Sequence, residues 1–123
     1  MKRNPAVADL STRTKAFALR IVRLFAALPK TTEAQVLGRQ LLRCGTSVGA
    51  HYREASRARS NAEFVSKLNC GLAELEEALY WIELLADSNI VQAARLAELR
   101  AEDSELIAIF VTCTKNAKQN RDK

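Results

Sequence analysis

The stretch from Arg39 to Leu85 constrains the fold of this chain more than any other part of it. It consists of two long amphipathic segments that meet at a break near Ser60, and each segment repeats apolar residues every three or four positions. This spacing is typical of helices that bury one face, whereas a half-buried strand would alternate with a period of two. No segment of the chain shows that alternation over any length. The pattern therefore predicts an all-α fold before it indicates any function.

Four helices are predicted, joined by short links. The first stops before Pro29, because the residue that precedes a proline is disfavoured in a helix. The second begins at Thr32 with Gln35 as a capping box, and the third begins at Ser60 with Glu63 in the same role. The predicted helices cover about residues 10–28, 32–57, 60–87 and 91–118, followed by a polar tail at 119–123. These elements favour a single domain, an antiparallel up-down-up-down four-helix bundle.

One acidic run is a candidate interruption of the fourth helix. It reads Glu102-Asp103-Ser104 and lies between apolar positions that would otherwise face inward. The fourth predicted helix could therefore be broken at this point.

The composition indicates a cytoplasmic protein without a membrane segment. Apolar residues make up 48% of the 123 residues, yet no uninterrupted apolar run approaches the roughly 18 residues that a membrane span requires. The N-terminal residues lack the apolar region of a signal peptide. Cys44, Cys70 and Cys113 are odd in number and widely spaced, so we interpret them as small buried hydrophobes in a reducing cytosol.

Charge is distributed unevenly along the chain. Residues 1–59 carry twelve Lys and Arg against three acids, a net charge of +9, whereas residues 60–123 carry seven against eleven, a net charge of −4. The basic and acidic helices could complement one another within the bundle or between subunits. The basic surface could instead attract phosphate.

Seven arginines in the first two predicted helices are the candidate nucleic-acid-binding residues. They are Arg13, Arg20, Arg23, Arg39, Arg43, Arg53 and Arg57. The four in the second helix share one side of it, so their guanidinium groups could follow a nucleic-acid backbone with strong salt dependence. Alternatively they form ion pairs with acids of the third helix, such as Glu74, Glu76, Glu77 and Glu83. No stacking aromatics interleave with the arginines, which favours the ion pairs.

Two glycines in the middle of the second helix require an explanation. Gly45 and Gly49 lie one turn apart, and each costs roughly 1 kcal/mol of helix stability relative to alanine. A glycine permits close approach of another backbone. That backbone could belong to a neighbouring helix of the same bundle or to a second subunit.

The third predicted helix is apolar beyond its main stripe. Trp81 lies about 100° from the stripe that contains Leu75 and Ile82, with Leu85 on the same side and Tyr80 farther away. Tyr80, Trp81 and Leu85, with the two glycines, are therefore candidate packing or oligomer-interface residues. A wide core and an interface anchor both explain them.

The sequence contains no arrangement of residues that predicts catalysis. There is no Glu-x-x-His pair for a di-iron bundle, no phosphate-binding glycine loop and no Cys–His pair. His51 is the only histidine, which leaves too few clustered ligands for a zinc site. We therefore expect no enzymatic activity, no metal and no cofactor.

Several short runs resemble a known bacterial family. They are Arg39–Arg43, Gly45–Ala50, Tyr52–Ala55, Ala58–Ser60, Glu63–Phe64 and Tyr80–Leu85. The chain is similar over about Thr12 to Lys118 to the four-helix-bundle family named for 23S rRNA intervening-sequence proteins. Cys70–Ala73 stands where the family varies, and the fourth helix carries little of the pattern.

This resemblance implies an antiparallel bundle that assembles as a cyclic homopentamer, with Gly45, Gly49 and Trp81 at packing and interface positions. Some family members are encoded within rRNA intervening sequences. A related accessory protein of diversity-generating retroelements is a basic partner of a reverse transcriptase and nucleic acid.

The expected function is therefore that of a non-enzymatic, homo-oligomeric bundle that binds RNA, or DNA, through its arginines. The competing hypothesis is a protein-interaction scaffold with no nucleic-acid ligand, in which the arginines form ion pairs. The exposure of the arginines distinguishes the two: a continuous exposed row favours RNA, and pairing with third-helix glutamates favours the scaffold.

Overall fold

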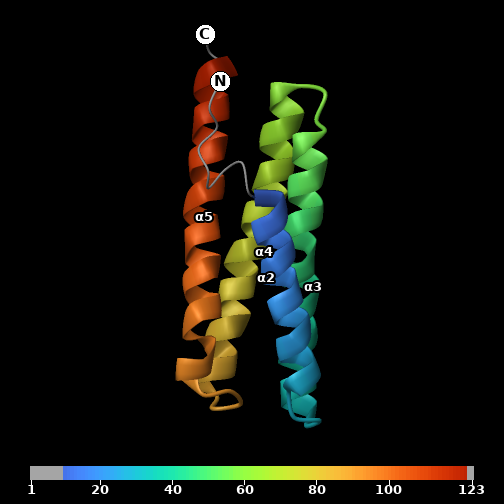
Figure 1. Cartoon of the computed structure of the whole chain (residues 1–123), viewed down its shortest axis with the longest axis vertical. Helices are drawn as coiled ribbons and strands as arrows, with labels where there is room; N and C mark the ends of the chain where they lie inside the picture. The colour runs from blue at the N-terminus through green and yellow to red at the C-terminus, as the bar shows by residue number, and fades with distance from the viewer. Residues whose placement is uncertain (1–9, 122–123) are drawn as a thin grey trace.

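The computed structural model describes residues 10–121 and folds them into four α-helices (Figure 1). The helices are α2 (Leu10–Ala27), α3 (Thr32–Ser56), α4 (Asn61–Asp87) and α5 (Ala93–Arg121). Each connection spans only a few residues, so consecutive helices run in opposite directions. The prediction of an all-α, up-down-up-down four-helix bundle is confirmed, and no strand occurs among the described residues.

A threonine caps the start of α3, but one residue earlier than predicted. Thr31 is the N-cap, and its Oγ1 accepts a hydrogen bond from the Ala34 N–H at 3.4 Å. Gln35 closes no capping box, because its side chain donates to the Pro29 carbonyl oxygen at 2.9 Å. The prediction of a capping box at Thr32 was therefore wrong. Two adjacent threonines offer the same cap chemistry, and the path of the chain out of α2 selects between them.

Ser60 caps α4 as predicted, but the predicted capping box is not closed, because Glu63 accepts from the Arg59 N–H and not from the Ser60 N–H. The Ser60 hydroxyl accepts a hydrogen bond from the Glu63 N–H at 3.1 Å, while the Glu63 carboxylate accepts one from the Arg59 N–H at 3.1 Å. The other end of α4 passes through Ser88 to Asn89, which adopts φ 61°. Asparagine tolerates this left-handed conformation better than most residues, and it turns the chain towards α5.

The fourth bundle helix, α5, continues without a break through the acidic run at 102–104. The prediction of an interruption was wrong, because the helix is regular here and both acids of this run lie on the side that meets the other helices. Asp103 points into the bundle and is fully buried, and Glu102 forms an ion pair with Arg13 of α2.

The core contains one apolar stripe from each helix. Its largest fully buried side chains include Phe17 and Ile21 from α2, Leu41 from α3, Leu75 from α4 and Phe110 from α5. Burying an apolar side chain of this size stabilises a fold by about 1.5–3 kcal/mol. None of the described helices has an apolar stretch long enough to cross a bilayer.

The four sides of the bundle differ in how closely their helices pack. Contacts are most extensive between α3 and α4, followed by α4 with α5 and α2 with α3, whereas α2 and α5 touch little. The shortest helix, α2, covers only part of the length of α5 (Figure 1). Accordingly α2 is held mainly by α3, and its opposite flank is bridged to α5 by charged side chains.

Candidate nucleic-acid interface

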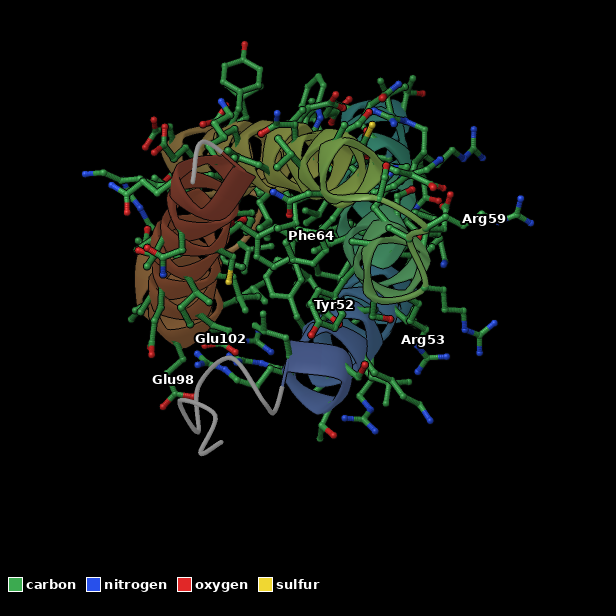
Figure 2. All side chains as sticks on the ribbon, turned by 90° about the horizontal axis from the view of Figure 1, so that it is seen from above. Tyr52, Arg53, Arg59, Phe64, Glu98 and Glu102 are labelled. Atoms are coloured by element: carbon green, nitrogen blue, oxygen red, sulfur yellow. The ribbon has the colours of Figure 1, made fainter. Side chains whose placement is uncertain are left out.

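A basic face lies on the outer side of α2 and α3. It comprises Lys15 of α2, Arg39 and Arg53 of α3, and Arg57, which is the C-cap of α3. All four side chains are exposed. Figure 2 shows Arg53 and the neighbouring Arg59 pointing outward from this side of the bundle. The three arginines lie on one side of α3, because Arg53 follows Arg39 by about four helical turns and Arg57 follows Arg53 by about one turn. In the described part of the chain, none of the four cations of the basic face forms an ion pair.

Two predicted arginines on α2 instead face α5. Arg13 forms an ion pair with Glu102 at 2.6 Å and with Glu105 at 3.2 Å, and Arg20 lies 4.0 Å from Glu98. Figure 2 shows Glu98 and Glu102 on the edge of α5. The hydrogen bond with Glu102 raises the pKa of Arg13 above its ordinary value, and Arg13 stays charged. Arg13 and Arg20 are therefore engaged within the chain.

Arg43 lies one turn from Arg39 on α3 but is engaged with acids of α4. It forms an ion pair with Glu74 at 3.3 Å and a second one with Glu77 of α4. Glu77 also accepts a hydrogen bond from the Trp81 indole N–H at 3.0 Å. Arg43 thus takes part in the ion pairing with the third predicted helix that was the alternative to RNA binding.

Arg23 is exposed on α2 and forms no ion pair with any described residue. The seven predicted arginines therefore divide into two groups. Arg13, Arg20 and Arg43 are paired with acids, whereas Arg23, Arg39, Arg53 and Arg57 are not. They do not form one uninterrupted row.

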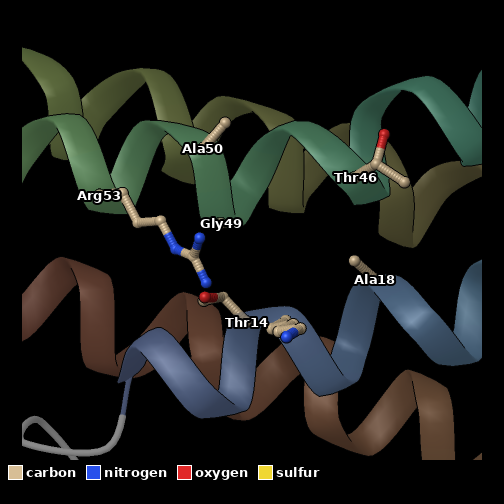
Figure 3. Close-up of a pocket in the computed structure, with 7 residues that line it drawn as sticks. Thr14, Ala18, Thr46, Gly49, Ala50 and Arg53 are labelled. Atoms are coloured by element: carbon tan, nitrogen blue, oxygen red, sulfur yellow. The ribbon is translucent and has the colours of Figure 1, made fainter.

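A surface groove lies within the basic face, between α2 and α3. Its volume is about 320 Å³, and Figure 3 looks into it. Arg53 reaches from α3 across the groove towards Thr14 of α2 (Figure 3). The lining residues are Thr14, Lys15, Ala18, Thr46, Gly49, Ala50 and Arg53. Lys15 is not among the binding residues that the sequence predicts. The helical repeat placed it off the Phe17 and Ile21 stripe, but nothing in the sequence indicated which helix it would meet.

The two unexplained glycines of α3 pack against α2 of the same chain. A Cβ atom on Gly45 would lie 2.3 Å from Ile21 Cδ1, and one on Gly49 would lie 3.2 Å from Thr14 Oγ1. Thr14 is itself fully buried, and its hydroxyl donates to the Leu10 carbonyl oxygen at 2.7 Å. Of the two alternatives for the glycines, the structure shows the close approach within the bundle.

The candidate interface residues of α4 differ sharply in exposure. Leu85 is fully buried in the core, and Trp81 is half-buried against it. Tyr80 is 54% exposed, and its ring meets the Trp81 ring edge-on with centroids 5.1 Å apart. Tyr80 therefore offers the largest exposed aromatic surface on α4.

The titratable groups of the interior are scattered. Burial raises the pKa of Asp103 to about 8 and that of the Cys44 thiol to about 12. His51 lies on the side of α3 that meets α4, and its Nδ1 is 3.6 Å from Glu54 Oε1. The described residues hold no group of three or more His, Cys, Asp or Glu side chains that could bind a metal ion. The basic face, with its groove, is thus the feature of the described surface best suited to a ligand, and its chemistry favours an anion.

Comparisons with known proteins place this arrangement in context. A protein-family model described as 23S rRNA-intervening sequence protein matches residues 8–112. Among solved structures, the chain is similar to the crystal structure of a protein of unknown function from the S23 ribosomal protein family of Bacteroides thetaiotaomicron. The two are 34% identical with a TM-score of 0.81, and the match covers 85% of this chain and 97% of that one. No curated protein matches the chain.

Proposed function

The chain belongs to the 23S rRNA-intervening sequence protein family, and from this premise we propose that it is a cytoplasmic, non-enzymatic, homo-oligomeric bundle that binds RNA through its basic face. The surface that would contact RNA comprises Lys15, Arg39, Arg53 and Arg57, and Arg23 is a further exposed cation of α2. The bundle itself would serve as a rigid support for these cations.

The observation that carries this proposal is that no cation of the basic face forms an ion pair with a described residue. Arg39, Arg53 and Arg57 are exposed and unpaired among the described residues, although the same chain pairs Arg13 and Arg43 with glutamates. A guanidinium group that is not neutralised by a carboxylate can bind a phosphate in two-pronged fashion. Three such groups on one side of a helix would bind a polyanion mainly through counterion release.

We also propose that the chain assembles with copies of itself, as a cyclic homopentamer. Tyr80 supports self-association, because it is exposed beside Trp81, and tyrosine and tryptophan are enriched among the residues that anchor protein interfaces. A ring would present several basic faces to one RNA molecule. The second and later contacts would then form at a high effective concentration and strengthen binding.

The second candidate function is a protein-interaction scaffold without a nucleic-acid ligand. The ion pairs of Arg13, Arg20 and Arg43 favour it, because they show that part of the basic charge stabilises the bundle itself. In that case the exposed arginines would meet an acidic protein.

Binding of the purified protein to fluorescent RNA and DNA oligonucleotides at two salt concentrations tests the proposal, with the solution mass measured in the same samples. The substituted protein carries Arg39→Gln, Arg53→Gln and Arg57→Gln. We expect the slope of log affinity against log salt to fall by about 2, since a single-stranded phosphate contact contributes roughly 0.7.

A matched control removes the same charge from another helix, through Arg95→Gln, Lys115→Gln and Lys118→Gln on α5. RNA affinity that responds equally to both sets of substitutions would indicate a net-charge effect and contradict the basic face as the binding surface. A defined oligomer that binds no nucleic acid would favour the scaffold.

A further inference from the structure

The groove between α2 and α3 owes its space to small residues. Gly49 and Ala50 of α3 and Ala18 of α2 are among the residues that line it, and its volume is about 320 Å³. Ligand pockets in proteins range from about 300 to 1,000 Å³, so this groove is at the small end. It is suited to one unit of an extended chain, and it is too small for a folded partner.

Two cations from two different helices border this space. Lys15 belongs to α2 and Arg53 to α3, and neither forms an ion pair with a described residue. Arg53 presents a planar fork of donors, and Lys15 presents a compact charge on a flexible stem, so the two can approach one anion from two sides. The Thr46 hydroxyl does not donate to an anion in the groove, because it donates its hydrogen to the Leu42 carbonyl oxygen at 2.7 Å.

The floor of the groove is apolar, and no aromatic side chain lines it. A phosphate group alone would leave this floor uncovered, whereas a phosphate with its attached sugar would cover it. Without a stacking ring, the groove has no means of holding a base by its face. The chemistry therefore matches the repeating backbone of a single strand.

We propose that this groove binds one phosphodiester unit of a single RNA strand, with the phosphate between Lys15 and Arg53 and the ribose against Ala18, Gly49 and Ala50. This inference rests on the proposed function, because RNA supplies the phosphate. It predicts that the contact is independent of base identity. It also identifies Lys15, on α2, as a ligand of the phosphate.

A variant that fills the groove without changing any charge tests the site. Ala50→Leu adds a side chain on the exposed side of α3, and alanine and leucine have similar helix propensities. The probe is a fluorescent oligouridylate, followed by anisotropy over a range of salt. We expect about a tenfold loss of affinity, as for the loss of one charge-assisted contact. Ala101→Leu, at an exposed alanine of α5, is the matched control and should bind as the unsubstituted chain does.

A second variant removes the two cations and keeps the groove open. Lys15→Gln with Arg53→Gln should weaken oligouridylate binding at least as strongly, and should lower the salt slope by about 1.4. Lys115→Gln with Lys118→Gln on α5 removes the same charge elsewhere. Oligoadenylate should respond to all four variants in the same way as oligouridylate.

The possible failures are distinguishable. Undiminished RNA binding by Ala50→Leu and by the Lys15 and Arg53 double variant would overturn the groove site and leave the proposed function standing. An unsubstituted chain that binds no oligonucleotide would overturn the proposed function and the RNA assignment together. Inorganic phosphate binding that is lost in Ala50→Leu would then assign the groove to free phosphate, and oligoglutamate binding with the same dependence would assign it to an acidic protein.

Discussion

Arg13 of α2 and Glu102 of α5 form a two-pronged ion pair between neighbouring helices that otherwise touch little. The distance from Arg13 Nη2 to Glu102 Oε1 is 2.6 Å, and that from Nε to Oε2 is 3.2 Å. Only about a fifth of each side chain is exposed, 19% and 20% respectively. The pair is therefore sheltered from water and helps to hold α2 against the bundle.

Separating this pair should destabilise the bundle and leave RNA binding almost unchanged. We expect Arg13→Gln and Glu102→Gln each to lower the free energy of unfolding by about 1–2 kcal/mol, because the first leaves the partly buried Glu102 without its partner and the second leaves Arg13 with only the more exposed Glu105. The double variant should lose less than the sum, by about 1 kcal/mol. Chemical denaturation of the four proteins measures this coupling. Strictly additive losses, or a changed salt slope for RNA, would contradict it.

Gly71 is a place where a helix-favouring substitution should be harmful. A Cβ atom there would lie 2.8 Å from Phe110 Cε2, and the Phe110 ring is fully buried and packs beside Tyr52 with centroids 6.1 Å apart. The clash should outweigh the gain in helix propensity of about 1 kcal/mol and produce a net loss of about 1–2 kcal/mol in Gly71→Ala. Thermal unfolding tests this. The same substitution made in a Phe110→Leu background should be harmless, and an equal loss there would place the strain elsewhere.

Asp103 should make the stability of the fold depend on pH. Burial raises its pKa to about 8 from an ordinary 3.8, so the folded chain retains a proton that the unfolded chain has already lost. Because the folded state binds more protons between these values, stability should fall as the pH rises from about 4 to about 8 and show no further loss from this group above that. The loss should be on the order of several kcal/mol.

Asp103→Leu should remove this dependence and stabilise the fold at pH 8, since both carboxylate oxygens lack a hydrogen-bond partner in the described structure. Denaturation midpoints at pH 5 and pH 9 measure the effect, with Ser104→Ala at the neighbouring exposed position as the control. Parallel pH profiles for the unsubstituted chain and Asp103→Leu would show that Asp103 ionises normally in the fold.

Tyr80 should control assembly and have little effect on folding. Its side chain is 54% exposed, so Tyr80→Arg removes no core packing but places a charge where the proposed ring interface would be. We expect the solution mass to fall towards the 13.6 kDa of one chain, with helix content retained. Val111→Arg, at a 46% exposed apolar residue of α5, is the comparison and should keep the oligomer. An unchanged mass in Tyr80→Arg would exclude Tyr80 from the interface.

Helix content and core composition could be predicted from the sequence because both depend on local periodicity. Phe17 and Ile21 lie four residues apart on α2, as do Leu37 and Leu41 on α3, and of these Phe17, Ile21 and Leu41 are fully buried. The same reasoning failed at Asp103. A carboxylate in a helix normally points to solvent, and only the surrounding helices reveal that this one lies on the buried side.

The candidate interface could be predicted less completely. Arg13 and Arg53 look equivalent in the sequence, yet Arg13 is paired with Glu102 and Arg53 borders an open groove. Their difference arises from distant segments of the chain, because the acid that neutralises an arginine lies on another helix. No local pattern in the sequence shows which arginine will lie beside an acid of another helix.

The sequence by itself determined the four helices, the inward stripe of each and the need for a close approach at Gly45 and Gly49, since these follow from backbone geometry and from nearest neighbours along one helix. Only the tertiary structure decided that α2 makes that approach, that Glu102 reaches Arg13, and that Lys15 joins Arg53 at one groove. Packing fixes the distances between side chains on different helices, and those distances determine which charges are neutralised and which remain available to bind an anion.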